Sequence, residues 1–295
     1  MQKFNTETLL EINNWLEIKL KTTTNLTFVV PNPDQENNRS FKTWVDLAEL
    51  HFCKMLTPQK VNEDFIQLTF KKLDPKSSFH SAPIESKEEK YGTESIFFNI
   101  NKNEIPTFLH AYKRALEAVK VEKRKHILNL GINKGDEFEL IQQFIETETF
   151  DNIKFSGIDH SQSALDYAKR RFPKDNVQFY QQDINTINEL QLEKSDLIIS
   201  IGTLQSPSIN YKPFLMSLVQ EHLTHDGAFI LGFPNSRWID GELIYGAKAP
   251  NYPYSEMSLL YNDVIFAKKY LQQKKFRVTI TGREYVFLTA TKINN

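Results

Sequence analysis

The feature that most constrains the fold is a regular alternation of apolar runs and amphipathic segments from His126 onward. A short apolar run is typical of a strand, and a segment with apolar residues at helical spacing is typical of a helix. Strands that alternate with helices are joined by right-handed crossovers and form a parallel sheet. The predicted strands are HILNLG (126–131), KFSGID (154–159), VQFYQQD (177–183), SDLIISIG (195–202) and AFILGFP (228–234).

The C-terminal stretch departs from this alternation. FRVTITGREYVFLTATK (276–292) is predicted to form two β runs joined by a short turn. Two strands joined by a tight turn pair antiparallel. We therefore predict an α/β fold with a doubly wound, mostly parallel seven-stranded sheet that ends in an antiparallel hairpin. Helices are expected at 136–147, from the N-cap Ser161 through Phe172, at 214–223 and at 263–273, with HDG (225–227) as a turn before the fifth strand.

Residues 1–100 lack the alternation and are predicted to be a mainly helical N-terminal addition, a substrate or cap region before the α/β domain of residues 101–295. Residues 74–92 are polar and rich in turn-forming residues, which favours a linker or flexible loop. Residues 234–261 are predicted to be a lid inserted in the α/β domain, because so long a loop in a compact domain is usually functional. A loop packed for stability is the alternative. Helices are expected at 6–21, 41–55 and 104–120.

Composition and charge exclude several classes of protein. Apolar residues make up 40% and charged residues 25% of the 295, which is enough for a packed core. The net charge of −1 argues against a strongly electrostatic binder of nucleic acid or of anionic membranes. The single cysteine, Cys53, excludes an internal disulfide framework and a multi-cysteine zinc site, and no metal is predicted. No apolar run approaches the ~20 residues of a membrane span, and MQKFNTETLLEINNW does not resemble a secretory signal, so a cytoplasmic protein is expected.

The ends of the predicted strands carry residues suited to ligand binding, which in open parallel sheets occurs at the carboxyl ends of the strands. The first strand leads into GINKG, where Gly131 and Gly135 have a G-x-x-x-G spacing. That spacing does not match the G-x-G-x-x-G of a pyrophosphate-binding turn. It suits a tight turn that passes close to a nucleoside without a phosphate. A purely structural turn is the alternative.

Acidic residues follow the next two strands. Asp159 ends the second strand and is suited to accept charge-assisted hydrogen bonds from a ribose diol, although a helix cap is the alternative. After the third strand, Asp183 is suited to accept a hydrogen bond from the amino group of adenine, while Ile184 packs on the adenine ring. After the fourth strand, Ile201 precedes Gly202, where a small residue leaves room for an adenosyl group.

In order and spacing, these motifs resemble the class I S-adenosylmethionine-dependent methyltransferase family over about residues 126–292. The resemblance is carried by LNLGINKG, GIDHS, QQDI and SDLIISIGTLQS. It implies an enzyme that binds S-adenosyl-L-methionine, with the glycine turn near the methionine part, Asp159 on the ribose and Asp183 near the adenine. For His160 the alternative is a helix-start residue with its ring outside the pocket. The implied cofactor-binding residues are Asn129, Gly131, Asn133, Gly135, Asp159, His160, Asp183, Ile184, Ile201 and Tyr91, the last as a lid residue.

Two residues depart from the family pattern. Asn129 stands where the family usually has an acid, and Asn133 stands where it has a glycine. An amide can hydrogen-bond to the cofactor's ammonium or carboxylate but carries no charge. Asn tolerates left-handed backbone angles better than most residues, so we expect the turn to persist. These departures leave open a methyltransferase-like fold that binds a ligand or partner without catalysis.

The methyl acceptor is expected to contact parts of the chain outside the shared core. Methyl transfer is an in-line displacement, so the enzyme mainly aligns and desolvates the reactants. No paired carboxylates or His–Asp pair identify a general base, and TLQS (203–206) replaces the Asn-Pro-Pro-aromatic signature of many amino-directed methyltransferases. Arg237 and Tyr245 are the catalytic candidates. A small-molecule acceptor is favoured over RNA, and no oligomeric state is predicted. The candidate substrate contacts are Asn235, Arg237, Trp238, Tyr252 and Tyr254.

Overall fold

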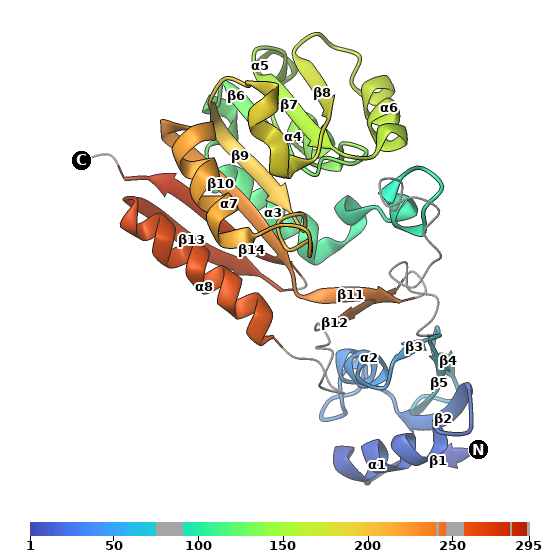
Figure 1. The fold of residues 1–295 in the computed structure, drawn as a ribbon. Coiled ribbons are helices and arrows are strands. Elements are labelled where there is room, and N and C mark those ends of the chain that lie inside the picture. Colours follow the sequence, from blue (N-terminus) through green and yellow to red (C-terminus); the bar gives the residue numbers. More distant parts are fainter. Residues whose placement is uncertain (75–90, 240–241, 246–256, 284, 294–295) are drawn as a thin grey trace. The chain divides into compact units, whose positions relative to one another are not determined.

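The computed structural model describes residues 1–74, 91–239, 242–245, 257–283 and 285–293. The chain divides into two compact units (Figure 1). One consists of residues 1–82 with 238–245, and the other of residues 83–237 with 246–295. Most of the predicted linker at 74–92 and part of the predicted lid lie outside the described residues.

The larger unit is built on a seven-stranded sheet in the order β13-β14-β10-β9-β6-β7-β8. Neighbouring strands pair parallel except at β14, which runs antiparallel to both β10 and β13. The prediction of a mostly parallel sheet with an antiparallel terminal hairpin is therefore confirmed. The strands are β6 (His126–Leu130), β7 (Lys154–Asp159), β8 (Val177–Gln181), β9 (Ser195–Ile201), β10 (Leu223–Pro234), β13 (Phe276–Gly282) and β14 (Tyr285–Lys292).

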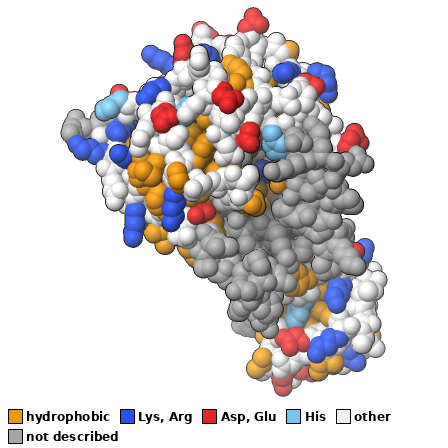
Figure 2. Space-filling model, in the orientation of Figure 1, with side chains coloured by type: hydrophobic (Ala, Val, Ile, Leu, Met, Phe, Trp, Pro, Cys, Tyr) orange, Lys and Arg blue, Asp and Glu red, His pale blue; other side chains and the backbone are white. Residues whose placement is uncertain are grey.

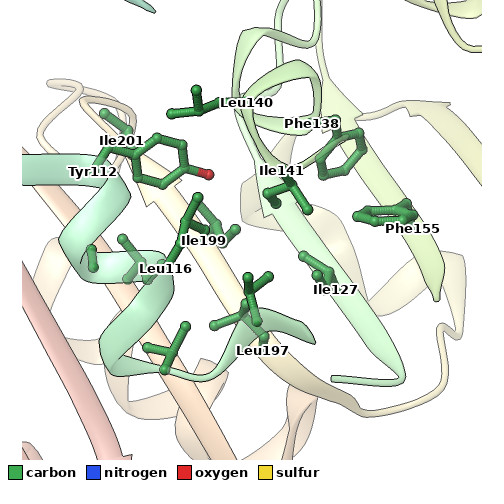
Figure 3. Close-up of a cluster of buried hydrophobic side chains, with 14 of the residues drawn as sticks. Tyr112, Leu116, Ile127, Phe138, Leu140, Ile141, Phe155, Leu197, Ile199 and Ile201 are labelled. Atoms are coloured by element: carbon green, nitrogen blue, oxygen red, sulfur yellow. The ribbon is translucent and has the colours of Figure 1, made fainter. Parts of the chain in front are cut away.

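Helices cover both faces of this sheet (Figure 1). Figure 3 shows the core on one face, where Tyr112 and Leu116 of α3 and Ile141 of α4 pack with Ile127 of β6 and Ile199 of β9. β6 and β9 are buried on both faces, and each carries a short apolar run rather than an alternation of apolar and polar residues. The helices are α3 (Pro106–Ala118), α4 (Asp136–Phe144), α5 (Thr147–Asp151) and α6 (Gln162–Arg171) on that face, and α7 (Tyr211–Ser217), η8 (Leu218–His222) and α8 (Ser258–Gln273) on the other.

Four short 3-10 helices lie in the described part of this unit. Two of them, η4 and η5, come directly before α3 in the chain. Their bounds are η4 (Ile96–Asn99), η5 (Lys102–Glu104), η6 (Val121–Lys123) and η7 (Ile184–Leu190).

The predicted turn HDG (225–227) before the fifth strand is wrong. These residues lie within β10, where Leu223 pairs with Ser195 and Ala228 pairs with Leu197. Residues 224–227 therefore stand opposite the single residue Asp196, as in an enlarged β-bulge. The polar residues mark an irregularity within the strand and do not mark its beginning.

The smaller unit corrects the prediction of a mainly helical N-terminal addition. It contains a five-stranded sheet in the order β1-β2-β5-β3, with β4 also paired to β5. In β5, Ile66, Leu68 and Phe70 are buried and alternate with less buried residues, which is the period of a strand. The elements are β1 (Gln2–Lys3), α1 (Leu9–Lys19), β2 (Asn25–Pro31), α2 (Phe41–Leu50), β3 (Cys53–Met55), β4 (Gln59–Lys60) and β5 (Phe65–Lys72).

This unit has a core of its own. Ile12 of α1 and Trp44 of α2 are fully buried with Phe28 of β2 and Phe70 of β5. Phe28 makes edge-on contacts with the Trp44 and Phe70 rings at centroid distances of 6.3 and 5.1 Å. The two helices and the sheet are thus held together by apolar burial and aromatic packing.

Most predicted helices occur, with shifted ends. The first is α1, which begins after Thr8, whose side chain and that of Glu11 form a capping box. The predicted helix at 41–55 ends at Leu50, because Phe52 adopts a φ of 54° and the chain continues into β3. No helix in the described part of the chain is long and apolar enough to cross a bilayer.

Candidate functional site

Four of the predicted site residues lie at one edge of the seven-stranded sheet. Asn129 is in β6, Gly131 follows β6, Asp159 ends β7 and Ile201 ends β9. β6 is central, with β7 and β8 on one side and β9 and β10 on the other. The chain order therefore reverses between β6 and β9, which is where open α/β sheets bind ligands.

The turn after β6 requires glycine at two positions. Gly131 has a φ of 78°, and a Cβ there would lie 2.0 Å from Thr203 Oγ1. Gly135 has a φ of 89°, and a Cβ there would lie 2.7 Å from the Phe172 ring. Asn133 is left-handed with a φ of 47°, which confirms that an asparagine can replace the usual glycine in this turn. The turn thus leaves no room for side chains at the two glycines.

Asp159 connects this turn to the start of α6. Its Oδ2 accepts the N–H of Asn133 at 2.9 Å, and its Oδ1 accepts the N–H of Ser161 at 3.0 Å. The cap of α6 is Ser161, whose side chain accepts the N–H of Ala164. Each carboxylate oxygen of Asp159 retains capacity for a further hydrogen bond. Asp159 is therefore a structural tie, and its binding to a ribose stays a prediction.

The residues after β8 have two different environments. Asp183 is exposed, and its Oδ1 accepts the N–H of Asn185 at 2.9 Å at the start of η7. Ile184 is only 7% exposed and packs in the core on the α7–α8 face. The N–H of Gln182 donates to the Asp159 carbonyl at 3.0 Å, which keeps the end of β8 beside the end of β7.

Residues 91–105, which we call the cap segment, are tied to the glycine turn by two side chains of that turn. Asn133 Nδ2 donates to the Tyr91 carbonyl at 2.7 Å. Lys134 Nζ donates to the Phe98 carbonyl at 2.6 Å. Tyr91, predicted from its position in the sequence alone, therefore lies beside the turn.

The side chains of Tyr91 and His160 meet near Asp159. Their ring centroids are 6.1 Å apart, and His160 Nδ1 is 3.7 Å from Asp159 Oδ1. Burial and the negative charge of Asp159 raise the pKa of the Tyr91 phenol. Tyr91 is thus a neutral phenol at the end of β7.

Sequence reasoning missed a cluster formed by Lys102, Glu137 and Tyr285, which we call the Lys102 cluster. Lys102 Nζ lies 5.6 Å from the centroid of the Tyr285 ring, and Tyr285 is at the start of β14. Glu137 is 5% exposed in the first turn of α4. The sequence did carry one signal for Glu137, which lies one helical turn before the buried Ile141. An acidic residue therefore stands on the apolar face of a predicted helix.

The ionisation of this cluster is strongly perturbed. Burial raises the pKa of Glu137 to about 7, although the Lys102 ammonium acts in the opposite direction. Burial acts to lower the pKa of Lys102, but Tyr285 and Glu137 act to raise it, and the pKa is raised overall. Such pKa shifts are frequent at functional sites, where charged groups are desolvated together.

Two buried amides at the strand ends have side-chain polar atoms without a hydrogen-bond partner in the described chain. Both side-chain polar atoms of Asn129 are without a hydrogen bond among the described residues, and Asn129 is 1% exposed. Asn235, which follows β10, donates to the Arg283 carbonyl at 3.2 Å, while its Oδ1 has no partner in the described chain. A buried polar atom without a hydrogen bond costs about 1–3 kcal/mol. Unmet hydrogen-bonding capacity of this kind fits the binding of a polar ligand.

The other candidate acceptor contacts are only partly described. Residues Ser236–Ile239 (β11) and Glu242–Tyr245 (β12) form a two-stranded sheet that contains Arg237, Trp238 and Tyr245. Their side chains lie outside the described structure, as do Tyr252 and Tyr254 entirely. The described residues contain no group of three or more His, Cys, Asp or Glu side chains placed to hold a metal ion.

Comparison with solved structures gives distant likenesses. TehB of Haemophilus influenzae is 15% identical, with 79% of this chain and 72% of that chain covered and a TM-score of 0.42. A TehB-like S-adenosylmethionine-dependent methyltransferase of Corynebacterium glutamicum is 18% identical, with 62% and 87% covered and a TM-score of 0.40. An S-adenosylmethionine-dependent methyltransferase of Aquifex aeolicus is 17% identical, with 61% and 89% covered and a TM-score of 0.42. None of the curated proteins is detectably similar in sequence.

Residues 121–277, more than half of the chain, match the model of a family described as methyltransferase domain. The strand ends fit the cofactor of such enzymes. The carboxylate of Asp159 suits a ribose diol, and the unpartnered amide of Asn129 suits an amino acid. The chain belongs to the methyltransferase-domain family and is a class I S-adenosylmethionine-dependent methyltransferase.

Proposed function

We propose that this enzyme methylates a small polar molecule that is held at the end of β10. The observation that carries the proposal is the buried Asn235, whose Oδ1 has no hydrogen-bond partner among the described residues. An acceptor with an N–H or O–H group would satisfy this oxygen. A buried amide is reached more readily by a small molecule than by a folded nucleic acid.

The charge distribution supports a small molecule over RNA. Lys and Arg total 36 against 37 Asp and Glu. Figure 2 shows Asp and Glu side chains interspersed with Lys and Arg on the face in view. Proteins that bind nucleic acid generally present a basic stripe or patch to the phosphates. A mixed surface of this kind favours a small acceptor over a polyanion such as RNA.

In the proposed reaction, S-adenosylmethionine supplies a methyl group already activated by its sulfonium. The residues of the chain align the acceptor and exclude water. Asn235 orients the acceptor through Oδ1. Tyr285 is 7% exposed and packs against Gly202, because a Cβ at Gly202 would lie 3.7 Å from the Tyr285 ring. Tyr285 therefore limits the space beside Gly202 at the end of β9.

Arg237 is proposed as a second acceptor contact. It lies in β11, two residues after Asn235. A guanidinium is suited to clamp a carboxylate or phosphate on the acceptor. We expect Arg237→Ala to leave cofactor binding nearly intact and to abolish methyl transfer to an anionic acceptor.

The test is transfer of a labelled methyl group from S-adenosylmethionine to separated metabolite and RNA fractions. Label is expected in the metabolite fraction. Asn235→Ala is expected to lower the transfer ~10-fold or more while S-adenosylhomocysteine still binds, because one orienting hydrogen bond is lost. Asn152→Ala is the matched control, since the Asn152 side-chain amide donates to the carbonyl of Glu148, four residues before it, and to no other residue in the described chain.

The other outcomes are distinct. Label in the RNA fraction would replace the small-molecule acceptor with RNA. Intact cofactor binding without transfer to either fraction would favour a non-catalytic binding protein. An unchanged rate in Asn235→Ala would remove Asn235 from the acceptor site.

A further inference from the structure

The methionine part of the cofactor is a zwitterion. Its recognition requires a negative group for the ammonium and a positive group for the carboxylate, or strong hydrogen-bonding groups in their place. The residue at the end of β6 that would usually be acidic in this family is Asn129, which is neutral. Its amide is buried without a partner among the described residues and can both donate and accept hydrogen bonds. Asn129 alone therefore supplies hydrogen bonds but no charge for the cofactor's ammonium.

The Lys102 cluster supplies the missing charges close to the same strand ends. Glu137 is in the first turn of α4, which directly follows the glycine turn, and Lys102 approaches from the cap segment. Lys102 Nζ lies 5.3 Å from the Phe97 ring centroid and 5.6 Å from that of Tyr285. Tyr285 in turn packs on Gly202 at the end of β9. A cation and a carboxylate are thus held near the two strands between which the chain order reverses.

Lys102 and Glu137 interact electrostatically, because each is among the groups that shift the pKa of the other. Glu137 is one of three carboxylates that raise the pKa of Lys102, together with Asp136 and Asp159. No ion pair joins Lys102 to any of them within the described chain. Because the buried Glu137 and the partly buried Lys102 are not paired with each other, both charges remain available to a third group.

The other two carboxylates are already engaged. Asp136 pairs with Arg171 at 2.8 Å and lies 3.7 Å from Lys134. Asp159 accepts two backbone N–H groups. Glu137 has neither kind of partner from another residue in the described structure. Of the three carboxylates, Glu137 therefore has the most capacity left to accept an ammonium.

We propose that Glu137 accepts the ammonium and Lys102 binds the carboxylate of the cofactor's methionine part, with the Asn129 amide adding hydrogen bonds to the same group. Glu137 thereby provides the negative charge that Asn129 does not. Both residues act as positioning residues, because they fix the amino-acid end of the cofactor. The inference rests on S-adenosylmethionine as the cofactor and not on the identity of the acceptor.

The test compares two ligands that differ in the amino-acid part. S-adenosylhomocysteine carries the zwitterion, whereas 5′-methylthioadenosine carries the adenosine and the sulfur but no amino acid. We expect Glu137→Gln and Lys102→Met each to weaken S-adenosylhomocysteine binding ~10-fold or more in calorimetric titrations. Binding of 5′-methylthioadenosine should change less than about twofold in the same variants.

Matched controls come from a surface pair on α3. Lys113 and Glu117 are 4.0 Å apart and more than half exposed. Lys113→Met and Glu117→Gln make the same changes in charge, and both ligands should bind them as they bind the wild type. Lys102→Arg, which keeps the cation, should retain more affinity for S-adenosylhomocysteine than Lys102→Met, and this comparison carries the test if Glu137→Gln does not fold.

Three results would overturn the proposal. The first is wild-type affinity of Glu137→Gln for S-adenosylhomocysteine, whether or not methyl transfer falls. The second is an equal loss for both ligands, since it would show a general change in the pocket. The third is identical affinity of the Arg and Met variants at Lys102. Failure of the wild type to bind either ligand would instead contradict the cofactor itself.

Discussion

At the scale of single residues, Asp159 is expected to act in both structure and binding. Asp159→Ala removes the acceptor for the N–H groups of Asn133 and Ser161, which should lower the free energy of unfolding by about 1–2 kcal/mol. It should also weaken S-adenosylhomocysteine binding by about 2 kcal/mol or more, because charge-assisted bonds to the ribose are lost. Urea unfolding and calorimetry measure the two effects, with the exposed Asp166→Ala as control. Wild-type affinity in a folded Asp159→Ala protein would leave Asp159 a structural tie only.

Glu137 should make the stability of the protein depend on pH. Burial raises its pKa from 4.5 to about 7, so the folded state holds this proton more tightly than the unfolded state. The corresponding stability is fully present below the ordinary pKa and is lost as the pH rises through about 7. The loss amounts to about 3 kcal/mol. Glu137→Gln cannot ionise, so its unfolding free energy should fall about 3 kcal/mol less between pH 5 and pH 8. Equal pH dependence in the two proteins would contradict this expectation.

At the scale of elements, the cap segment should depend on the glycine turn for its order. Lys134 Nζ donates to the carbonyls of Phe98 and Ile100 at 2.6 and 2.9 Å. Lys134→Met removes both bonds, so amide hydrogens of residues 96–105 should exchange ~10-fold faster or more. Exchange in β6 should not change, and Lys113→Met serves as control. Unchanged exchange in the cap segment would show that other contacts hold it.

The elements also show what could be predicted from the sequence. The strands of the larger unit were predictable because burial on both faces gives β6 and β9 short apolar runs that stand between helices. The N-terminal sheet was missed although β5, FIQLTFKK, alternates with the period of a strand. The end of α2 was not predictable from turn residues, because the left-handed residue there is Phe52 and not glycine or asparagine.

The site was predictable where it lies on the strand ends and less so elsewhere. Gly131 and Asp159 follow their strands directly, so the strand prediction placed both at one edge of the sheet. The Lys102 cluster combines residues that are far apart in sequence, and only the packing of the cap segment, α4 and β14 brings them together. A sequence pattern reports local period and spacing, so such a cluster leaves little local signal.

At the scale of the whole molecule, the two units should be separable in their effects. Phe28 is fully buried in the core of the N-terminal unit, whereas every residue proposed to hold the cofactor lies in the other unit. Phe28→Ala should therefore destabilise the N-terminal unit by about 3–5 kcal/mol without changing affinity for S-adenosylhomocysteine. Phe155 lies in the core of the larger unit, so Phe155→Ala should lower both the stability of that unit and the affinity for S-adenosylhomocysteine. A large loss of affinity in Phe28→Ala would show that the N-terminal unit shapes the cofactor site.

The position of β14 in the sheet sets an order of events during synthesis of the chain. β14 lies between β10 and β13, although it follows both in sequence. Until β14 leaves the ribosome, β10 is an open sheet edge and β13 has no neighbour, so the nascent chain passes through a stage that is exposed to aggregation. Tyr285 begins this strand. Tyr285, which packs on Gly202, is therefore synthesised after Lys102, Glu137 and Asn129. The cofactor site at the carboxyl ends of the strands is complete only when β14 has joined the sheet.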